Sequence, residues 1–517
     1  MRLLSGRATL AHICILISHF LFANGAENEF FDTPPAYEAA TVRRKHYQTV
    51  DFTSPDFHTT LWHDNAINLD LPYIFFTDTH RTKSRPIVIS SKDLSLVYAG
   101  EEYDATENLR VQRYNGEEYL TFWHGGNARG NDQGSCRFLN DKYELFFSTQ
   151  SYDLKWDTDQ HECEVTPYGT VLVTVYEPKT RDLSDIGGQA EDTMFDSCFQ
   201  EIDIATEKLL FQWCASEHIP VSETYAAYGK TSKGRGWDAY HINSLQRDED
   251  GNYFVSLRRL FAVVKINGKD GSRMWQLGGK MNNFTDLSNG HALDFAWQHH
   301  THFSGPGFTQ LTMFDNHNNA GERVVGCVGT SCSRGVRLEL DYEAMTVRHL
   351  QDFYSPTGLL SYAMGSYQEL EGGNVLMGYG NNPQITEFAP NGVPVMSFRF
   401  GPLDGAVRTY RVYKDHWEGR PGWPPSIAVE KHNNEVWLWM SWNGATGVRS
   451  WAVYDAEEST AASQNGAAST AKATVGKQGF ETRVVLQNVQ RFVWAAALDA
   501  DGEILGKSDI LEMSADS

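Results

Sequence analysis

Positive charge is scarce in this 517-residue sequence. It has 44 Lys and Arg against 66 Asp and Glu, which gives a formal net charge of −22. Proteins that bind nucleic acid need a basic face to meet the phosphates. The charge balance therefore argues against a nucleic-acid partner. It identifies no other partner, because most acidic side chains simply keep a protein surface solvated.

Long hydrophobic runs are also missing, except near the N-terminus. Leu10 to Ala23 is largely apolar, follows Arg2 and Arg7, and leads into small residues. This order predicts a secretory signal peptide over residues 1–25, and the run is short for a membrane span. We therefore expect the mature chain to be secreted and to have no membrane span. In such a chain the sequon at Asn283 is a possible glycan site.

Cysteine is sparse, with seven residues in the sequence. Cys14 lies in the predicted signal peptide, and the other six are Cys136, Cys163, Cys198, Cys214, Cys327 and Cys332. An even number in an exported chain predicts disulfides, although six cysteines allow many pairings. Pairing of nearest neighbours is our hypothesis, with Cys327–Cys332 closing a loop and Cys198–Cys214 clamping a hairpin.

Amphipathic helical patterns longer than a few turns are absent as well. Aromatic residues make up 13% of the chain and glycine occurs 44 times, a composition typical of strands joined by tight turns. The length favours two domains, or one large repeat domain with an appendage. The sequence thus predicts an all-β protein.

A hairpin pattern recurs along the first four-fifths of the chain. Apolar strands flank a polar turn at Gln200 to Trp213, Val264 to Leu277 and Ile385 to Phe400, and a second type with a Gly turn alternates with them. Two hairpins make a four-stranded blade, so this repeat favours a β-propeller of about six blades over residues 47–410. A large β-sandwich or barrel is the alternative.

The composition changes after Arg411. Residues 411–513 contain strand patterns on both sides of an Ala/Ser/Thr/Gly-rich stretch at 457–477. This arrangement predicts a small β-sandwich of the immunoglobulin or fibronectin type III kind, with 457–477 as a flexible insert. We expect it to be structural and docked against the propeller.

Polar residues occupy equivalent places in successive repeats. His161 and the pair His241 and Asn243 each precede a Gly-turn hairpin, Arg258 ends the hairpin after His241, and His299 precedes another strand. The innermost strands of a propeller converge on a central channel, so these residues would face one another. The pattern predicts one polar funnel that resembles an active site.

Each of these side chains also has a structural interpretation. A histidine in a β-rich chain is more often a hydrogen-bonded structural residue, and the Asp159 carboxylate near His161 is what such a histidine needs. Arg258 beside Arg259 fits a solvated pair. Recurrence at like places favours function for His241 and His299.

Six short runs between His161 and Gln368 carry a family resemblance. They are QEIDIATEKLLFQW, HINSLQRDEDGNYFVSLR, MWQLGG, FAWQHH, MFDN and GSYQEL. Together they resemble the arylsulfotransferase family, the arylsulfate sulfotransferases that use no nucleotide donor, and most closely its eukaryotic, largely fungal branch. The resemblance implies a six-bladed propeller with its active site in the central channel, and chemistry that needs neither a metal nor a nucleotide.

The resemblance also implies roles for the funnel residues. His299 would be the nucleophile that becomes transiently sulfated, and His161, His241 with Asn243, and Arg258 match the family's other site residues. An imidazole would attack the sulfur of an aryl sulfate, donors would hold the sulfuryl oxygens, and a phenol would then take the group. The family usually has an acidic residue where His300 stands.

Two alternatives from other classes remain open. One is a non-catalytic secreted propeller that binds an extracellular glycan or protein. The other is a metal-dependent hydrolase built on His299, His300 and His302, although the spacing matches no established zinc signature.

Overall fold

The computed structural model describes residues 42–80, 83–126, 133–228, 236–317, 332–403, 405–458 and 470–513. Within these ranges the protein is all-β, as predicted, and its only α-helix is the single turn α1 (Ala215–His218). None of the described helices is long and apolar enough to cross a membrane. The predicted signal peptide and Cys327 lie outside the described residues.

Six sheets of mainly antiparallel strands follow one another along the chain. The first contains β4 (Tyr73–His80), β5 (Lys83–Ser90), β6 (Leu96–Ala99), β29 (Val407–Arg408) and β30 (Val412–Asp415). The second contains β7 (Thr106–Tyr114), β8 (Glu117–Gly125), β9 (Gly134–Leu139) and β10 (Leu145–Thr149). The third contains β11 (Cys163–Val165), β12 (Thr170–Arg181), β13 (Asp192–Asp203), β14 (Lys208–Cys214) and β15 (Trp237–Asp238).

In the remaining three sheets, too, most neighbouring strands follow one another along the chain. The fourth contains β16 (Ile242–Arg247), β17 (Tyr253–Leu257), β18 (Ala262–Ile266) and β19 (Arg273–Gly278). The fifth contains β20 (Thr285–Asp286), β21 (His299–Ser304), β22 (Gln310–Asp315), β23 (Arg334–Asp341) and β24 (Thr346–Tyr354). The sixth contains β25 (Ser366–Glu369), β26 (Val375–Gly378), β27 (Gln384–Phe388), β28 (Pro394–Arg399) and β3 (His58–Trp62).

The predicted hairpins are confirmed. Gln200 to Trp213 forms the β13–β14 pair, Val264 to Leu277 the β18–β19 pair, and Ile385 to Phe400 the β27–β28 pair. In the turn between β13 and β14, the Asp203 carboxylate accepts hydrogen bonds from the backbone N–H and the hydroxyl of Thr206, both at 2.7 Å. An Asp side chain that bonds the backbone just ahead of it stabilises such a turn.

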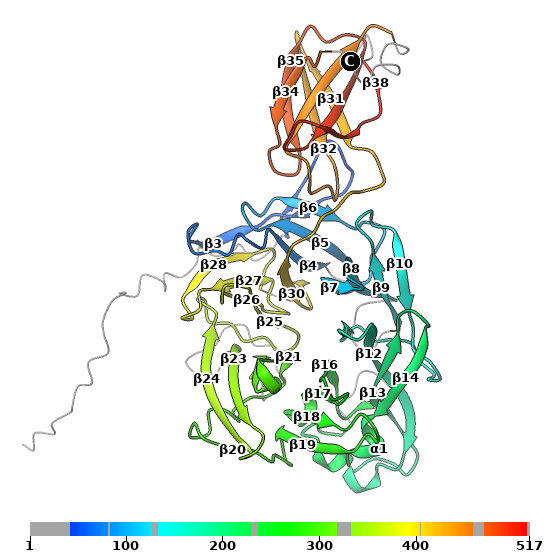
Figure 1. Cartoon of the computed structure of the whole chain (residues 1–517), viewed down its shortest axis with the longest axis vertical. Helices are drawn as coiled ribbons and strands as arrows, with labels where there is room; N and C mark the ends of the chain where they lie inside the picture. Colours follow the sequence, from blue (N-terminus) through cyan, green and yellow to red (C-terminus); the bar gives the residue numbers. More distant parts are fainter. Residues whose placement is uncertain are drawn as a thin grey trace, which may run out of the picture.

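The six sheets form a ring around a common centre, with β7, β16, β21 and β25 toward the middle and β10, β14 and β24 toward the outside (Figure 1). Successive sheets pack through six separate apolar cores, one of which joins the sixth sheet to the first. Phe254 of β17 stacks on Phe303 of β21 with ring centroids 3.9 Å apart. Because each buried aromatic stabilises the fold by about 1.5–3 kcal/mol, these cores hold neighbouring sheets together.

Strands from both ends of the chain close the ring. β3 pairs with β28 at the outer edge of the sixth sheet, and β30 pairs with β4 in the first sheet. β30 begins at Val412, just beyond the predicted boundary at residue 410. The ring therefore depends on pairings between segments more than 300 residues apart in the sequence.

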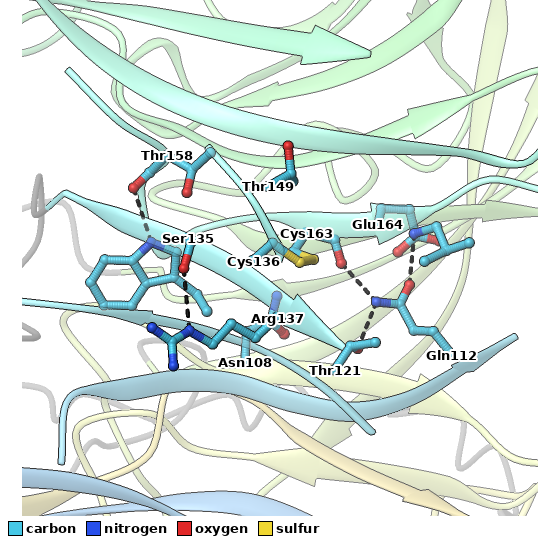
Figure 2. Close-up of a disulfide and its surroundings, with 12 residues drawn as sticks. Asn108, Gln112, Thr121, Ser135, Cys136, Arg137, Thr149, Thr158, Cys163 and Glu164 are labelled. Carbon is cyan, nitrogen blue, oxygen red and sulfur yellow. Dashed lines mark hydrogen bonds between the residues drawn. A yellow bond between two sulfur atoms is a disulfide. The ribbon is translucent and has the colours of Figure 1, made fainter. Parts of the chain in front are cut away.

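Two disulfides join strands of the ring. Cys198 and Cys214 are bonded across β13 and β14, as predicted. Cys136 of β9 and Cys163 of β11 are also bonded and link the second sheet to the third (Figure 2). Beside that bond, Gln112 Nε2 donates to the carbonyl of Cys163 at 2.9 Å. Cys332 is disulfide-bonded as well.

Two further sheets follow the ring and share an apolar core. One contains β31 (Ser426–His432), β32 (Glu435–Ser441) and β35 (Thr482–Gln487). The other contains β33 (Ser450–Ala456), β34 (Ala473–Gly476), β36 (Phe492–Leu498), β37 (Ile504–Lys507) and β38 (Leu511–Glu512). They lie outside the ring beyond β5 and β6 (Figure 1). Asn443 ties them to the first sheet through both polar backbone atoms of Ala99, at 3.0 and 2.9 Å.

Candidate active site

Three histidines from three different sheets lie together at the centre of the ring. His161 just precedes β11, His241 directly precedes β16, and His299 is the first residue of β21. The His161 and His241 ring centroids are 4.8 Å apart. The Tyr410 ring lies 5.6 Å from the ring of His161 and 6.5 Å from that of His299. The structure thus brings together the three histidines that the repeat pattern placed in one funnel.

The backbone around these histidines is strained. His241, Trp297 and Met364 have φ values of 58°, 59° and 65°, in the left-handed region that bulky residues rarely adopt. Such residues cost on the order of 1–3 kcal/mol each and are found together mainly at functional sites. Their presence beside His299 is a first indication that this end of the ring acts on a ligand.

A hydrogen-bond network fixes the tautomer of His299. Its Nδ1 lies 2.6 Å from Asn316 Oδ1. The Asn316 Nδ2 donates to the carbonyls of Ser361 and Met364, both at 2.9 Å, which sets the orientation of the amide. Oδ1 can only accept, so Nδ1 of His299 carries the proton and Nε2 carries the lone pair.

The Nε2 atom of His299 accepts one long hydrogen bond, 3.2 Å from the backbone N of Met364. Burial, and then the nearby positive charge of Arg258, hold the pKa of His299 well below its usual range. The ring is therefore neutral at physiological pH, and the one contact of its lone pair is the long one from Met364. A neutral imidazole of this kind is a competent nucleophile.

His161 and His241 each pair with a carboxylate through Nδ1. The partner of His161 is Asp159, and that of His241 is Asp238 at 2.5 Å. Burial lowers the pKa of His241 to about 3, in spite of the Asp238 charge. Burial opposes ionisation of Asp238, but Arg259 and His241 hold its pKa below the usual range. In the neutral state both imidazoles therefore donate Nδ1–H to a carboxylate and carry a lone pair on Nε2.

Arg258 supplies positive charge to the site. Its guanidinium lies 4.5 Å from the centre of the Trp297 ring, and one Nη donates to the carbonyl of Tyr362 at 2.8 Å. Its Nε and the Nε1 of Trp297 are buried without a hydrogen-bond partner among the described residues. Burial, followed by Arg259, lowers the pKa of Arg258 to about 10, so the group stays charged at neutral pH. Unpaired buried donors beside a buried cation are suited to an anionic ligand.

Asn243 connects the strands that carry the histidines. Its Nδ2 donates to the carbonyl of Gln298 at 2.7 Å and so holds the residue before His299. The carbonyl of Asn243 accepts from Arg411 at 2.7 Å. The side chain therefore positions β21 rather than facing the three imidazoles as a group.

His300 points away from the other three histidines. Its Nδ1 accepts from the backbone N of Tyr367 at 3.1 Å, and its Nε2 lies 3.3 Å from the Tyr413 hydroxyl. The described residues do not gather His299, His300 and His302 within ligand distance of one another. The hypothesis of a metal-dependent hydrolase therefore finds no set of three histidine ligands among the described residues.

A buried ion pair between Arg411 and Glu162 lies next to His161, and we call it the floor of the site. Arg411 makes two-pronged contacts to Glu162 at 2.9 and 3.1 Å, and both side chains are almost fully buried. Arg110 reaches the same carboxylate at 3.3 Å. Burial raises the pKa of Glu162, but Arg411 and Arg110 outweigh it and lower that pKa below its usual value.

Sequence reasoning missed several of these partners. Asp238 stands three residues before His241, and Asn316 ends the MFDN run, so both could have been proposed from the nearby sequence. Arg411 could not, because Glu162 lies 249 residues away in the sequence. Tyr410 likewise reaches the site only because β30 returns to the first sheet.

Comparison with known proteins gives one clear match. The family model described as arylsulfotransferase (ASST) matches residues 110–401, which include all five predicted site residues. None of the curated proteins compared matches the chain.

Solved structures give only remote likenesses. A Bacteroides caccae protein of unknown function is 10% identical, with 66% of this chain and 97% of that chain covered and a TM-score of 0.39. The Malassezia sympodialis allergen Mala s 1 is 11% identical, with 65% and 86% covered and a TM-score of 0.32. These similarities carry no argument about this chain.

Proposed function

The chain belongs to the arylsulfotransferase family, and we propose that it transfers a sulfuryl group from a phenolic sulfate ester to a phenolic acceptor. The observation that carries the proposal is the state of His299. Its Nδ1 proton is held by Asn316, so the neutral ring keeps an Nε2 lone pair, and Arg258 and two further imidazoles are near enough to lower its pKa. That is what an attack on an anionic sulfur ester requires.

We also propose that the six sheets are the blades of a six-bladed β-propeller, over residues 47–410 with β30 added. The two C-terminal sheets would be an immunoglobulin-like or fibronectin III-like sandwich over the rest of 411–513, with its insert, predicted at 457–477, lying between β33 and β34 (Ala473–Gly476). Six apolar cores between successive sheets support the first assignment. Disulfides are compatible with export of the chain after removal of residues 1–25.

In the first half of the reaction, Nε2 of His299 attacks the sulfur of the aryl sulfate. The new N–S bond forms as the bond between the sulfur and the phenolic oxygen breaks. The electron pair of that bond leaves with the phenolate, which takes a proton from solvent. The Nδ1 proton stays on the ring, where the Asn316 carbonyl oxygen accepts it. The product is a sulfohistidine, and negative charge on its oxygens is stabilised by Arg258.

The backbone N–H of Met364 has a part in the same step. At 3.2 Å it is a weak partner for Nε2, and this contact must be lost as the sulfur arrives. The freed N–H then points to the place where a sulfuryl oxygen would lie. It would act there as one more donor to the transferred group.

In the second half, an acceptor phenol attacks the sulfur of the sulfohistidine. The neutral Nε2 of His241 takes the phenol proton, and the resulting imidazolium is stabilised by Asp238. The S–N bond breaks, its electron pair returns to His299, and His241 afterwards loses the proton to solvent. His161 with Asp159 forms a second pair of the same kind.

Mass spectrometry after incubation with 4-nitrophenyl sulfate tests the proposal. We expect a sulfuryl adduct on the peptide that contains His299, discharged by added phenol and absent from His299→Ala. The matched control is His302→Ala, on the same strand but outside the three-histidine cluster, which should form the adduct like the unchanged protein. Absence of both adduct and nitrophenol release would favour a non-catalytic binding propeller.

A further inference from the structure

The centre of the ring contains a cavity that the proposed reaction does not use. Its volume is ≈ 400 Å³. Each of the six sheets contributes to its lining, through Arg110, Glu164, Leu245, His302, Glu369 and Asp415. A volume of this size falls within the range of small-molecule sites.

The floor of the candidate active site separates this cavity from His299. Glu162 lines the cavity and is bonded to Arg411, and Tyr413 lines it and is bonded to Asn108 at 3.1 Å. His300 lines the cavity too, while its neighbour His299 does not. Of the two adjacent histidines of β21, therefore, only His300 serves this cavity, which we call the lower compartment.

The charged groups of the lower compartment are balanced. Glu164 pairs with Arg110 at 2.6 Å and Glu369 with Arg337 at 2.5 Å. In the same way Asp415 pairs with Arg113 at 3.3 Å and Glu162 with Arg411 at 2.9 Å. Each of the four lining carboxylates is therefore already paired with an arginine, of which only Arg110 itself lines the cavity.

Three buried polar atoms of the lower compartment lack a hydrogen-bond partner among the described residues. They are Tyr367 Oη, Ser304 Oγ and Arg110 Nε. Tyr367 is 1% exposed, and the nearby Arg337 does not meet its hydroxyl with hydrogen-bond geometry. Buried polar groups of native proteins are nearly always satisfied by protein, water or ligand, so this group of three calls for a partner.

We propose that the lower compartment binds a neutral, hydroxyl-rich ligand of about monosaccharide size. Hydroxyl groups both donate and accept, so they can meet the unpaired hydroxyls of Tyr367 and Ser304 as well as the carboxylate oxygens of Glu164 and Glu369. Because the lining carboxylates are already paired, a charged ligand would lose its hydration without finding a free counter-charge. The inference is independent of sulfuryl transfer at His299.

Tyr367→Phe is the decisive variant. Removing a buried hydroxyl without a partner should leave the melting temperature of the free protein unchanged or higher. The same change should weaken ligand binding at least about fivefold, since it deletes a hydrogen bond to the ligand. Tyr379→Phe is the matched control, because its hydroxyl is equally buried and unpaired but does not line the compartment.

Binding is measured by calorimetry and saturation-transfer NMR with glucose, galactose, mannose and inositol, and with glucosamine and glucuronate as charged analogues. We expect a dissociation constant of about 1 mM for at least one neutral compound, weakened in Tyr367→Phe and unchanged in Tyr379→Phe and His299→Ala. Failure of every neutral compound to bind would overturn the proposal. Tighter binding of a charged analogue, or equal binding by Tyr367→Phe, would overturn it as well.

Discussion

At the scale of single residues, burial more than any neighbouring charge keeps His299 and His241 of the candidate site neutral. His299 has an amide partner instead of a carboxylate, and the hydrogen bond to Asn316 does not outweigh the effect of burial and of Arg258 on its pKa. His241 does have a carboxylate partner, and its pKa is still lowered to about 3. Both rings therefore retain an unprotonated nitrogen well into the acidic range.

This leads to a prediction about pH. A lowered pKa means that protonation, which removes the Nε2 lone pair, sets in only at more acidic pH. We expect kcat/KM for 4-nitrophenyl sulfate to stay within about twofold between pH 8 and pH 5.5, because kcat/KM follows the free enzyme. An ordinary histidine with a pKa of about 6.5 would lose about tenfold over that interval.

The measurement is a set of initial rates at constant ionic strength, with a thermal melt at each pH to confirm that the protein remains folded. A single apparent pKa between 6 and 7 in the rate profile would contradict the assigned state of His299. It would then point to a more hydrated ring than the structure describes.

How far the site could be predicted also becomes clear at this scale. His161, His241 and His299 could be grouped because they occupy like positions in successive repeats, and such positions meet at the centre of a ring. The tautomer of His299 could not be predicted, since it depends on how the Asn316 amide is turned by two loop carbonyls. Those contacts follow from tertiary packing, and no periodic pattern in the sequence indicates them.

At the scale of elements, the short strand β30 and the residue before it connect two sheets of the ring. Its four residues complete the first sheet, and the residue just before it, Arg411, crosses to Glu162 of the third sheet. Local hairpins such as β13–β14 could be predicted from alternation and turn residues. The pairing of β30 with β4 could not, because it joins segments with no sequence relation to each other.

The Arg411–Glu162 pair gives a prediction about stability. Arg411→Met leaves the Glu162 carboxylate buried with only longer contacts, to Arg110, Asn108 and the backbone N of Cys163, so we expect a loss of about 3–5 kcal/mol in the free energy of unfolding. The double variant Arg411→Met with Glu162→Gln should lose less than the single one, because no uncompensated charge remains. Denaturant titration of each purified variant measures both.

Arg420→Met is the comparison variant for this series. Arg420 pairs with Glu418 on the surface, where both side chains are exposed, so its replacement should change stability by no more than about 0.5 kcal/mol. If Arg411→Met were equally mild, the ion pair would be a passive feature of the floor and not a tie between the first and third sheets.

At the scale of the whole molecule, the segment from Val42 to Trp62 joins three parts of the structure. β3 extends the sixth sheet, and Phe57 packs on Phe76 of the first sheet and Phe398 of the sixth. Glu481, next to the C-terminal sheets, accepts from the backbone N of Gln48 and Thr49, both at 2.8 Å. Residues near the start of the described chain thus hold the ring closed and fasten the C-terminal sheets to it.

A chain that begins at His63 should therefore be less stable than one that begins at Val42. Loss of the Phe57 contacts alone removes about 1.5–3 kcal/mol of apolar burial, and loss of β3 leaves the outer edge of β28 unpaired. We expect a lower melting temperature and self-association through that edge, measured by calorimetry and analytical ultracentrifugation. The chain from Val42 keeps β3 and should remain monodisperse. Equal melting temperatures for the two chains would mean that the inner pairing of β30 with β4 is enough to close the ring.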